Sequence, residues 1–459
     1  MEKALNLTQG NITKALIKLA LPIMGTSFIQ MAYTLTDIMW LGRLSTGAVA
    51  AAGTAGFFTW FAAGLILISQ VGIGTTVAQA YGRGELDEAK KYISNGLQLD
   101  FFIGIFYSMI LYVFREPLIG FFNIDDLEVH MMAVLYIRII SMGIIFYFLN
   151  PIFSTVLNST GNSFMPFRIN AMGLIFNIIL DPLLIFGLGP IPGLGIKGAA
   201  IATISSQFIV CMIFIIAGKK TNSIYAHVKI FKKPDLPYIK RISSLGFPAF
   251  LQTSVHSIIG MVLTRIVAGF GSTAIAVQAI GTQIESLTWM TAEGFSAAMS
   301  AFVGQNFGAG KLGRIKKGYR KGMQIVGSIG LFTTMLFVLF PGRIFSIFVP
   351  NDALALKEGI KYLRIMGISQ FLMSIEIGTA GAFNGLGKPL PHSIIGIVFN
   401  ILRIPMAIIL STYTVLGLEG VWWSISISSM MKGLILALMF TRLLKTDIFN
   451  NEASKSLGE

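Results

Sequence analysis

The feature that most constrains the fold is an internal repeat, in which the second half of the chain echoes the first at an offset of 226 residues. The segment Gln-Ala-Tyr-Gly-Arg-Gly at 79–84 returns as Gln-Asn-Phe-Gly-Ala-Gly at 305–310, and a lysine pair follows each copy. Other pairs at this offset are Pro22 and Pro248, Asp126 and Asp352, Tyr136 and Tyr362, Arg138 and Arg364, Asn158 and Asn384, and Gly161 and Gly387. A solenoid repeats every 20–50 residues or so. The longer period therefore indicates two fused lobes of similar fold.

The composition places both lobes in a membrane. Hydrophobic residues make up 54% of the 459 residues and charged residues only 12%, whereas charged residues are about 25% of an ordinary soluble domain. A helix needs roughly 20 mostly apolar residues to cross the hydrocarbon core. Twelve such stretches occur, six in each repeat: 13–41, 48–79, 92–114, 131–157, 164–187, 195–217, 239–269, 274–304, 319–340, 356–383, 391–413 and 418–442.

Because six is an even number, the second repeat enters the membrane from the same side as the first. This makes the repeats parallel, related by an axis along the membrane normal, with a substrate cavity expected between them. We therefore predict an all-α membrane protein with twelve transmembrane helices in two pseudo-symmetric six-helix lobes around a central cavity. The predicted parts are an N-terminal lobe at 1–217, a linker at 218–238, a C-terminal lobe at 239–445 and a tail at 446–459.

The distribution of basic residues predicts the orientation of the helices. The formal net charge is +14, and six basic residues without an acid lie between 311 and 321. The linker region is also rich in lysine, whereas the loop at 115–130 on the opposite side is acidic. The positive-inside rule then puts both termini, the linker and the tail in the cytoplasm of a multi-pass protein of the cytoplasmic (inner) membrane. No basic and aromatic module stands clear of the apolar stretches, so we expect no nucleic-acid partner.

Carboxylates within the apolar stretches call for a functional explanation, because a central Asp costs about 2.5–3.5 kcal/mol on insertion scales. Asp37 lies in the first stretch, and Asp181 lies in the fifth, four residues after Asn177 on the same helical face. Two carboxylates and an amide supply oxygens that can hold Na⁺, or the carboxyl groups can exchange a proton. The hydroxyl groups of Thr203 and Tyr136 are candidates to complete this group.

A structural explanation for these acids competes with the functional one. Asp181 precedes Pro182, so its side chain could repair backbone hydrogen bonding, or it could lie in water near a helix end. The repeat argues against a packing role common to both lobes. The counterpart of Asp37 is Leu263, and the counterpart of Asp181 is Ile404. The second lobe thus folds without either acid.

The second lobe has polar candidates of its own, which are His256, Glu285, Glu293, Glu376 and Arg403. Their counterparts in the first lobe are uncharged. One interpretation is a substrate or proton site. The other is an internal ion pair that holds the lobe together, formed by Glu376 or Glu285 with Arg403. The sequence leaves both open.

In this arrangement the chain resembles the multidrug and toxic compound extrusion (MATE) transporters of bacterial and archaeal type, which belong to the multidrug/oligosaccharidyl-lipid/polysaccharide exporter superfamily. The resemblance rests on the paired turns after the second and eighth stretches, with Phe-Val-Gly-Gln-Asn-Phe-Gly-Ala-Gly at 302–310, and on the helix exits at 157–162 and 383–388. It covers roughly residues 10–445. The resemblance implies efflux of organic, often cationic compounds driven by Na⁺ or H⁺ entry, with alternating access by movement of the lobes.

The resemblance also assigns roles to individual residues. Asp37, Asn177, Asp181 and Thr203 match the cation-site positions of the archaeal and related bacterial branch, and Tyr136 matches a further position of that site. Another branch uses an acid in helix seven together with an acid in helix ten. This chain departs from that pattern, because helix seven carries a histidine in the corresponding region.

Together these observations predict a secondary antiporter that exports lipophilic cationic compounds in exchange for H⁺ or Na⁺. The alternative is a flippase for lipid-linked oligosaccharides or other precursors, of the same superfamily, with Arg265 or Arg403 contacting phosphate. An enzyme is not expected, because the chain has neither a metal-ligand cluster nor a phosphate-binding loop, and only four histidines. We expect no cofactor besides the coupling ion, a drug-like small-molecule substrate, the lipid bilayer as surroundings, and a monomer.

Overall fold

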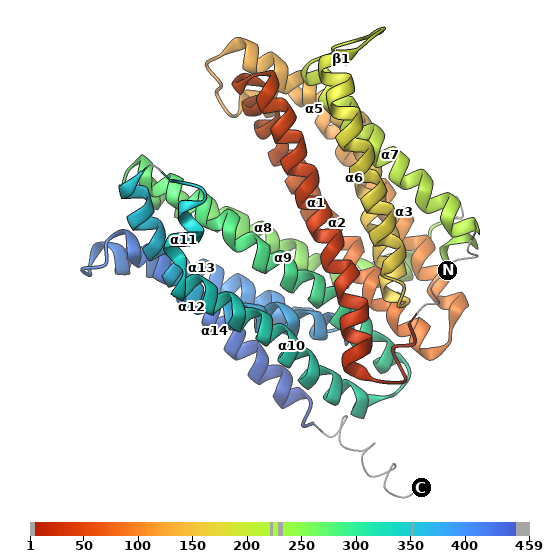
Figure 1. The fold of residues 1–459 in the computed structure, drawn as a ribbon. Coiled ribbons are helices and arrows are strands. Elements are labelled where there is room, and N and C mark those ends of the chain that lie inside the picture. The colour runs from red at the N-terminus through yellow and green to blue at the C-terminus, as the bar shows by residue number, and fades with distance from the viewer. Residues whose placement is uncertain (1–4, 221–223, 228–232, 351, 447–459) are drawn as a thin grey trace, which may run out of the picture. The chain divides into compact units, whose positions relative to one another are not determined.

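The computed structural model describes residues 5–220, 224–227, 233–350 and 352–446, which are almost entirely helical (Figure 1). The helices of the first half are α1 (Ile12–Leu44), α2 (Thr46–Arg83), α3 (Leu86–Val113), α4 (Arg115–Gly120), α5 (Leu127–Ser159), α6 (Phe164–Phe186) and α7 (Ile196–Lys220). Those of the second half are α8 (Leu236–Ala268), α9 (Ser272–Gly308), α10 (Leu312–Leu339), α11 (Pro341–Ser346), α12 (Ala353–Gly385), α13 (Leu390–Thr412) and α14 (Leu418–Leu443). A two-residue antiparallel pair, β1 (Gly187–Leu188) and β2 (Ile191–Pro192), and the 3₁₀ helix η1 (Ile224–His227) complete the list. Part of the expected linker and nearly all of the expected tail lie outside the described residues.

Twelve of the described helices are at least 23 residues long, and they coincide with the twelve apolar stretches. A helix of that length spans roughly 35 Å, enough to cross the hydrocarbon core. Ten of the twelve are long and apolar enough to be membrane spans by length and composition alone. The other two, α9 and α12, pack against each other and carry Glu285 and Glu376. Helices shielded by their neighbours tolerate such polar residues.

The aspartates of the repeat begin equivalent helices in the same way. Asp126 caps α5, and its Oδ1 accepts hydrogen bonds from the backbone N–H groups of Glu128 (2.8 Å) and Val129 (3.3 Å). Asp352 caps α12, and its Oδ1 accepts from the second and third residues of that helix at 3.0 and 2.9 Å. Each cap satisfies backbone donors that a helix start leaves unpaired.

The repeated Gly-containing turns end α2 and α9 with one hydrogen-bond pattern. The N–H of Gly84 donates to the carbonyl of Tyr81 at 3.1 Å, and that of Gly310 donates to the carbonyl of Phe307 at the same distance. Both glycines have positive φ angles, 79° and 71°, a conformation that glycine adopts with no penalty from a Cβ atom. These echoes of the sequence therefore describe scaffold.

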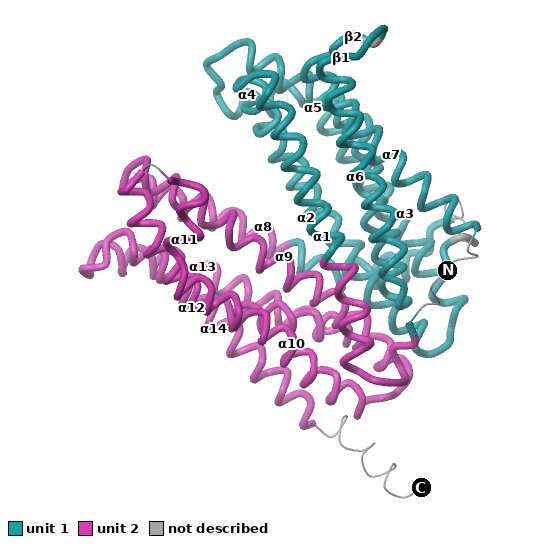
Figure 2. The backbone as a smooth tube through the Cα atoms, in the orientation of Figure 1, with its two compact units in different colours: residues 1–5, 25–250 teal, residues 6–24, 251–459 magenta. Residues whose placement is uncertain are grey.

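By packing, the chain forms two compact units, which Figure 2 shows in different colours. Unit 1 consists mainly of residues 25–250, and unit 2 consists of residues 6–24 and those from 251 onward. In unit 1, α5 packs against α2, α3 and α7, and in unit 2 the equivalent helix α12 packs against α9, α10 and α14. The long helices of each unit lie side by side as a bundle (Figure 1).

Helices α1 and α8 are each divided between the two units. The division falls three residues after Pro22 in α1 and two residues after Pro248 in α8. The first half of α8 packs against α2 within unit 1, where a Cβ atom on Gly246 would lie only 1.9 Å from the carbonyl oxygen of Ile68. The units thus follow packing, whereas the expected lobes followed the repeat, and the division into those lobes stays a prediction.

Candidate functional site

Unit 1 brings together side chains that the sequence places far apart. Asp37 comes from α1, Asn177 and Asp181 from α6, Thr203 from α7 and Tyr136 from α5. Asn177 and Asp181 are fully buried, and Tyr136 is 7% exposed. The five expected residues are therefore assembled from four different helices of one unit.

The contacts within this group are short and polar. Asn177 Nδ2 donates to Asp181 Oδ1 at 3.2 Å, across one turn of α6. Thr203 Oγ1 lies 3.4 Å from Asp37 Oδ2 and 3.0 Å from the carbonyl oxygen of Ala199, so its single proton is shared between the two acceptors. The Asp37 carboxyl group is also close enough to Asp181 and Asn177 for side-chain hydrogen bonding.

Several oxygens of this group have no protein partner in the described structure. They are Asp37 Oδ1, Asn177 Oδ1 and Asp181 Oδ2. No basic side chain of the described residues lies within 4.0 Å of either carboxylate. A buried polar oxygen without a partner costs free energy, and two adjacent carboxylates cost more. The arrangement has the oxygen ligands that a hard cation requires, and a proton shared between the carboxyl groups would serve as well.

Tyr33 is a member of this group that sequence reasoning missed. Its hydroxyl group is buried without a partner, and it interacts electrostatically with Asp37 and Asp181. Gly173 makes room for it, because a Cβ atom there would lie 2.4 Å from Tyr33 Oη. The available signal was spacing, since Tyr33 lies one helical turn before Asp37 on the same face of α1. Tyr136 interacts with Thr203 and Asp37 from the side of α5.

In unit 2 the structure replaces the expected ion pair with a different one. Glu376 Oε1 lies 3.0 Å from Lys432 Nζ, and both side chains are more than nine-tenths buried. Arg403 does not pair with Glu376 or Glu285, because no distance within 4.0 Å joins them. The interpretation in which Arg403 pairs with one of these acids is therefore wrong. Lys432 was missed although it stands inside the last apolar stretch, a signal as strong as that of Asp37.

The other expected residues of unit 2 are dispersed. Glu285, on α9, is half-buried and bonds to α12, while Arg403, on α13, bonds to serines of α14. His256 and Glu293 are exposed on α8 and α9, and Glu293 interacts with Trp289 of its own helix. Unit 2 does not assemble the five residues into one compact group.

A second carboxyl group in unit 1 was also missed. Asp100 of α3 is fully buried, and Ser69 Oγ of α2 donates to its Oδ1 at 2.5 Å. Its Oδ2 has no partner in the described structure. The signal was present, since Asp100 interrupts the third apolar stretch.

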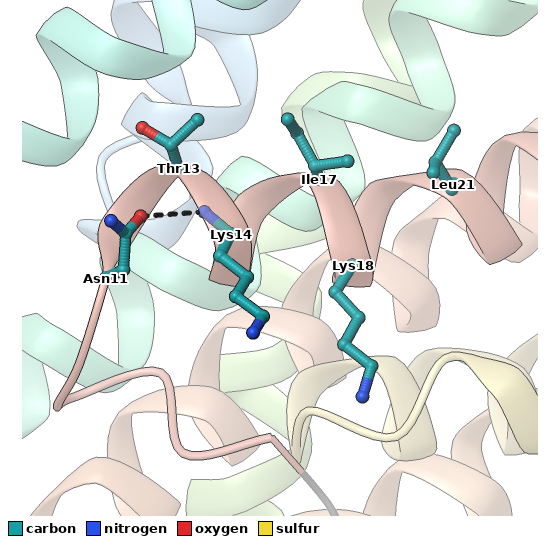
Figure 3. A pocket seen from close by; sticks show the side chains of 6 residues that line it. All are labelled: Asn11, Thr13, Lys14, Ile17, Lys18 and Leu21. Carbon is teal, nitrogen blue, oxygen red and sulfur yellow. Dashed lines mark hydrogen bonds between the residues drawn. The ribbon is translucent and has the colours of Figure 1, made fainter.

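A surface pocket lies elsewhere, along the first half of α1. It has a volume of about 550 Å³ and is lined by Asn11, Thr13, Lys14, Ile17, Lys18 and Leu21. Lys14 and Lys18 point to one side of the helix, and Ile17 and Leu21 point to the other (Figure 3). None of the expected site residues lines this pocket, so it is separate from the carboxylate group of unit 1.

Comparison with known proteins bears on these observations. The MatE family model matches residues 22–183 and 248–409. Both ends of the second segment lie 226 residues after those of the first, which is the offset of the repeat.

Relatives match over nearly the whole length. The chain is 29% identical over 454 residues to a probable multidrug resistance protein NorM of Thermotoga maritima, covering 97% of this chain and 96% of the relative. It is 26% identical to an FAD transporter of Shewanella oneidensis, covering 94% and 92%. The solved structure of MATE in the bent conformation superimposes with a TM-score of 0.90 at 22% identity, covering 98% of this chain and 100% of that one. The expected all-α membrane fold with twelve long helices is confirmed.

Proposed function

The chain belongs to the MatE family of multidrug efflux transporters, and from this premise we propose that it is a secondary antiporter that exports organic, lipophilic cationic compounds in exchange for H⁺ or Na⁺. The family consists of multi-pass membrane transporters of small molecules and not of enzymes. The antiport mechanism, the ion and the charge of the substrate are the proposed parts.

The observation that carries the proposal is the set of partnerless oxygens around Asp37, Asn177 and Asp181 in unit 1. They converge from α1 and α6, two helices joined in the chain only through four others. An ion that binds all of them stabilises the arrangement of α1 against α6. Loss of the ion leaves mutual repulsion between two carboxylates, which favours a different arrangement.

Coupling then needs only that ion and substrate prefer different states of the protein. A ligand shifts a conformational equilibrium by the difference between its affinities for the two states. Entry of H⁺ or Na⁺ at Asp37 and Asp181 favours one state, and a lipophilic cation competes for the same negative charge in the other. Carboxylate, amide and hydroxyl oxygens serve both ions, so we keep H⁺ and Na⁺ as alternatives.

The membrane setting is proposed from the charge pattern. The basic run at 311–321 begins α10, and Arg314 of that run donates to the carbonyl groups of Gln9 and Gly10 at 2.7 and 2.8 Å. The N-terminal segment and the basic run therefore lie at the same end of unit 2, which we assign to the cytoplasm by the positive-inside rule. We further propose that the protein functions as a monomer in the inner membrane.

Transport of an acidic compound is the alternative, either a lipid-linked precursor or a nucleotide-like molecule. Its support is Arg403 of unit 2, which lacks an acidic partner within 4.0 Å, together with the relative that carries FAD. The carboxylate pair of unit 1 favours the cation-coupled exporter, because two acids repel an anion.

The test is efflux of a lipophilic cation dye from proteoliposomes, with Na⁺ and pH gradients imposed separately. We expect one gradient to drive export, and Asp37→Asn and Asp181→Asn each to abolish the coupled component. Export at the wild-type rate by both variants under either gradient would show that the proposal is wrong. Export of an acidic dye alone would favour the alternative.

A further inference from the structure

Unit 2 holds two opposite charges that are not paired. Glu285 lies on α9 and Arg403 on α13. No oppositely charged side chain among the described residues lies within 4.0 Å of either. The two groups nevertheless interact electrostatically across the greater distance that separates them.

Each charge is held in place by neutral groups. Tyr362 Oη donates to Glu285 Oε1 at 2.6 Å, and Gln370 Nε2 donates to Glu285 Oε2 at 3.3 Å. Both donors come from α12 and both are buried. The carboxylate of Glu285 is thereby fixed at both oxygens without losing its charge.

The guanidinium group of Arg403 is positioned in the same manner from α14. Its Nε donates to Ser428 Oγ at 2.7 Å, and one of its terminal nitrogens donates to Ser429 Oγ at 3.0 Å. A guanidinium group has five N–H donors, so about three remain after these two bonds. Arg403 is only 5% exposed, which makes an unpaired charge there costly.

The remaining charges nearby do not offset Arg403. Glu376 is bound by Lys432 at 3.0 Å, and this pair satisfies both partners. The first unit shows that the fold does not need charges at this place. The counterpart of Glu376 is Asn150, whose Nδ2 donates to Gln207 Oε1 at 2.8 Å in a neutral bond.

Access to the two charges is available from α8 and α9. Glu285 is half-buried, and Trp289, one turn further along α9, is 45% exposed. His256 of α8 is exposed and interacts electrostatically with Arg403. An aromatic surface beside two fixed charges fits a ligand with an apolar body and a charged head.

We propose that Glu285 and Arg403 form a two-pole binding site for an amphipathic zwitterion, with the ammonium group of the ligand at Glu285 and its carboxylate at Arg403. Such a ligand supplies both missing partners at once and leaves no buried charge unpaired. The inference rests on the proposed function for its role in export, and it narrows the substrate class from cations to compounds that carry both charges.

The test measures equilibrium binding to the purified full-length protein, without any ion gradient. Three fluorescent probes share one body: ε-dansyl-lysine is a zwitterion, its methyl ester is a cation, and its Nα-acetyl derivative is an anion. The wild-type protein is expected to bind the zwitterion at least tenfold more tightly than either derivative. Binding of all three within twofold of one another overturns the proposal.

The variants assign the two poles. In Glu285→Gln the zwitterion is expected to bind no better than the acetylated probe, and in Arg403→Gln no better than the ester. Matched controls are Glu358→Gln and Arg265→Gln, which make the same changes on α12 and α8 of the same unit and should keep the tenfold preference. Retention of that preference by Glu285→Gln overturns the proposal. If Arg403→Gln does not fold, Arg403→Lys keeps the charge, and partial retention of the preference over the ester is expected.

This outcome is separable from that of the proposed function. Preferential binding without gradient-driven export would leave the two-pole site standing and remove the antiport proposal. Gradient-driven export of a cation by a protein that binds the three probes equally would do the reverse.

Discussion

Asn177 and Asp181 are joined by a 3.2 Å hydrogen bond across one turn of α6, and each still has one oxygen without a partner. The amide donor fixes one carboxylate oxygen and leaves the other facing the group formed with Asp37. One side chain thus orients the acid and supplies an oxygen of its own. This double role gives the first prediction.

Asn177→Ala is expected to weaken the apparent affinity for the coupling ion by about tenfold, the lower end of the effect of removing a group that orients an ion ligand. The measurement is the dependence of dye efflux on Na⁺ concentration and on pH. Asn170→Ala is the control, because Asn170 is also on α6 but bonds to the carbonyl of Pro166 at 2.8 Å. An equal effect of both changes would contradict a specific role for Asn177.

Tyr33→Phe separates binding from stability. Tyr33 Oη is buried without a partner, so its removal is expected to leave the melting temperature unchanged or higher. If the hydroxyl group contacts the ion, the same variant should need several-fold more ion for half-maximal efflux. A lower melting temperature together with an unchanged ion dependence would mean that Tyr33 serves packing alone.

Gly173→Ala tests the fit between α1 and α6. A Cβ atom at residue 173 would lie 2.4 Å from Tyr33 Oη and 2.3 Å from Val210 Cγ2. We expect most coupled efflux to be lost and the melting temperature to fall, because the helices must move apart. Gly53→Ala on α2 is the control, since nothing lies within 4 Å of the added carbon. Equal, small effects of both changes would contradict the close approach.

Lys432→Met is expected to destabilise the protein by about 3–5 kcal/mol, because it leaves the buried charge of Glu376 unpaired. The double variant Glu376→Gln with Lys432→Met removes both charges and should recover most of that loss. Thermal unfolding in detergent measures both, with the exposed Lys357→Met as control. If the double variant is no more stable than the single one, the pair is not an isolated stabilising unit.

Asp126→Ala and Asp352→Ala should each cost about 1 kcal/mol, the usual value for a lost helix cap. The effects should be similar, because each Asp accepts from two backbone N–H groups at the start of an equivalent helix. Both variants should keep the ion dependence of efflux. A change in ion dependence would mean that the repeat carries function as well as scaffold.

The sequence was informative where one residue or one period determines the outcome. The apolar stretches predicted twelve helices because hydrocarbon leaves the backbone no other way to satisfy its hydrogen bonds. Asp37 and Asp181 were recognisable because a carboxylate in such a stretch is costly. The 3.4 Å contact of Thr203 with Asp37 agrees with the candidate group expected from the sequence.

The sequence was uninformative where the answer depends on which helix faces which. Glu376 had Arg403 and Lys432 as possible partners, and the packing of α12 against α14 selects Lys432. Tyr33 enters the site only because Gly173, far along the chain, leaves space for its hydroxyl group. Spacing within one helix predicts a shared face, but it does not predict what lies opposite that face.

The most direct test of the central claim is the movement of the coupling ion itself, followed in proteoliposomes when substrate is added without any imposed gradient. The account predicts substrate-dependent movement of H⁺ or Na⁺ by the wild-type protein and by the control Asp126→Asn. It predicts none by the double variant Asp37→Asn with Asp181→Asn. Ion movement by that double variant at the wild-type ratio to substrate would contradict the assignment of the coupling site to unit 1.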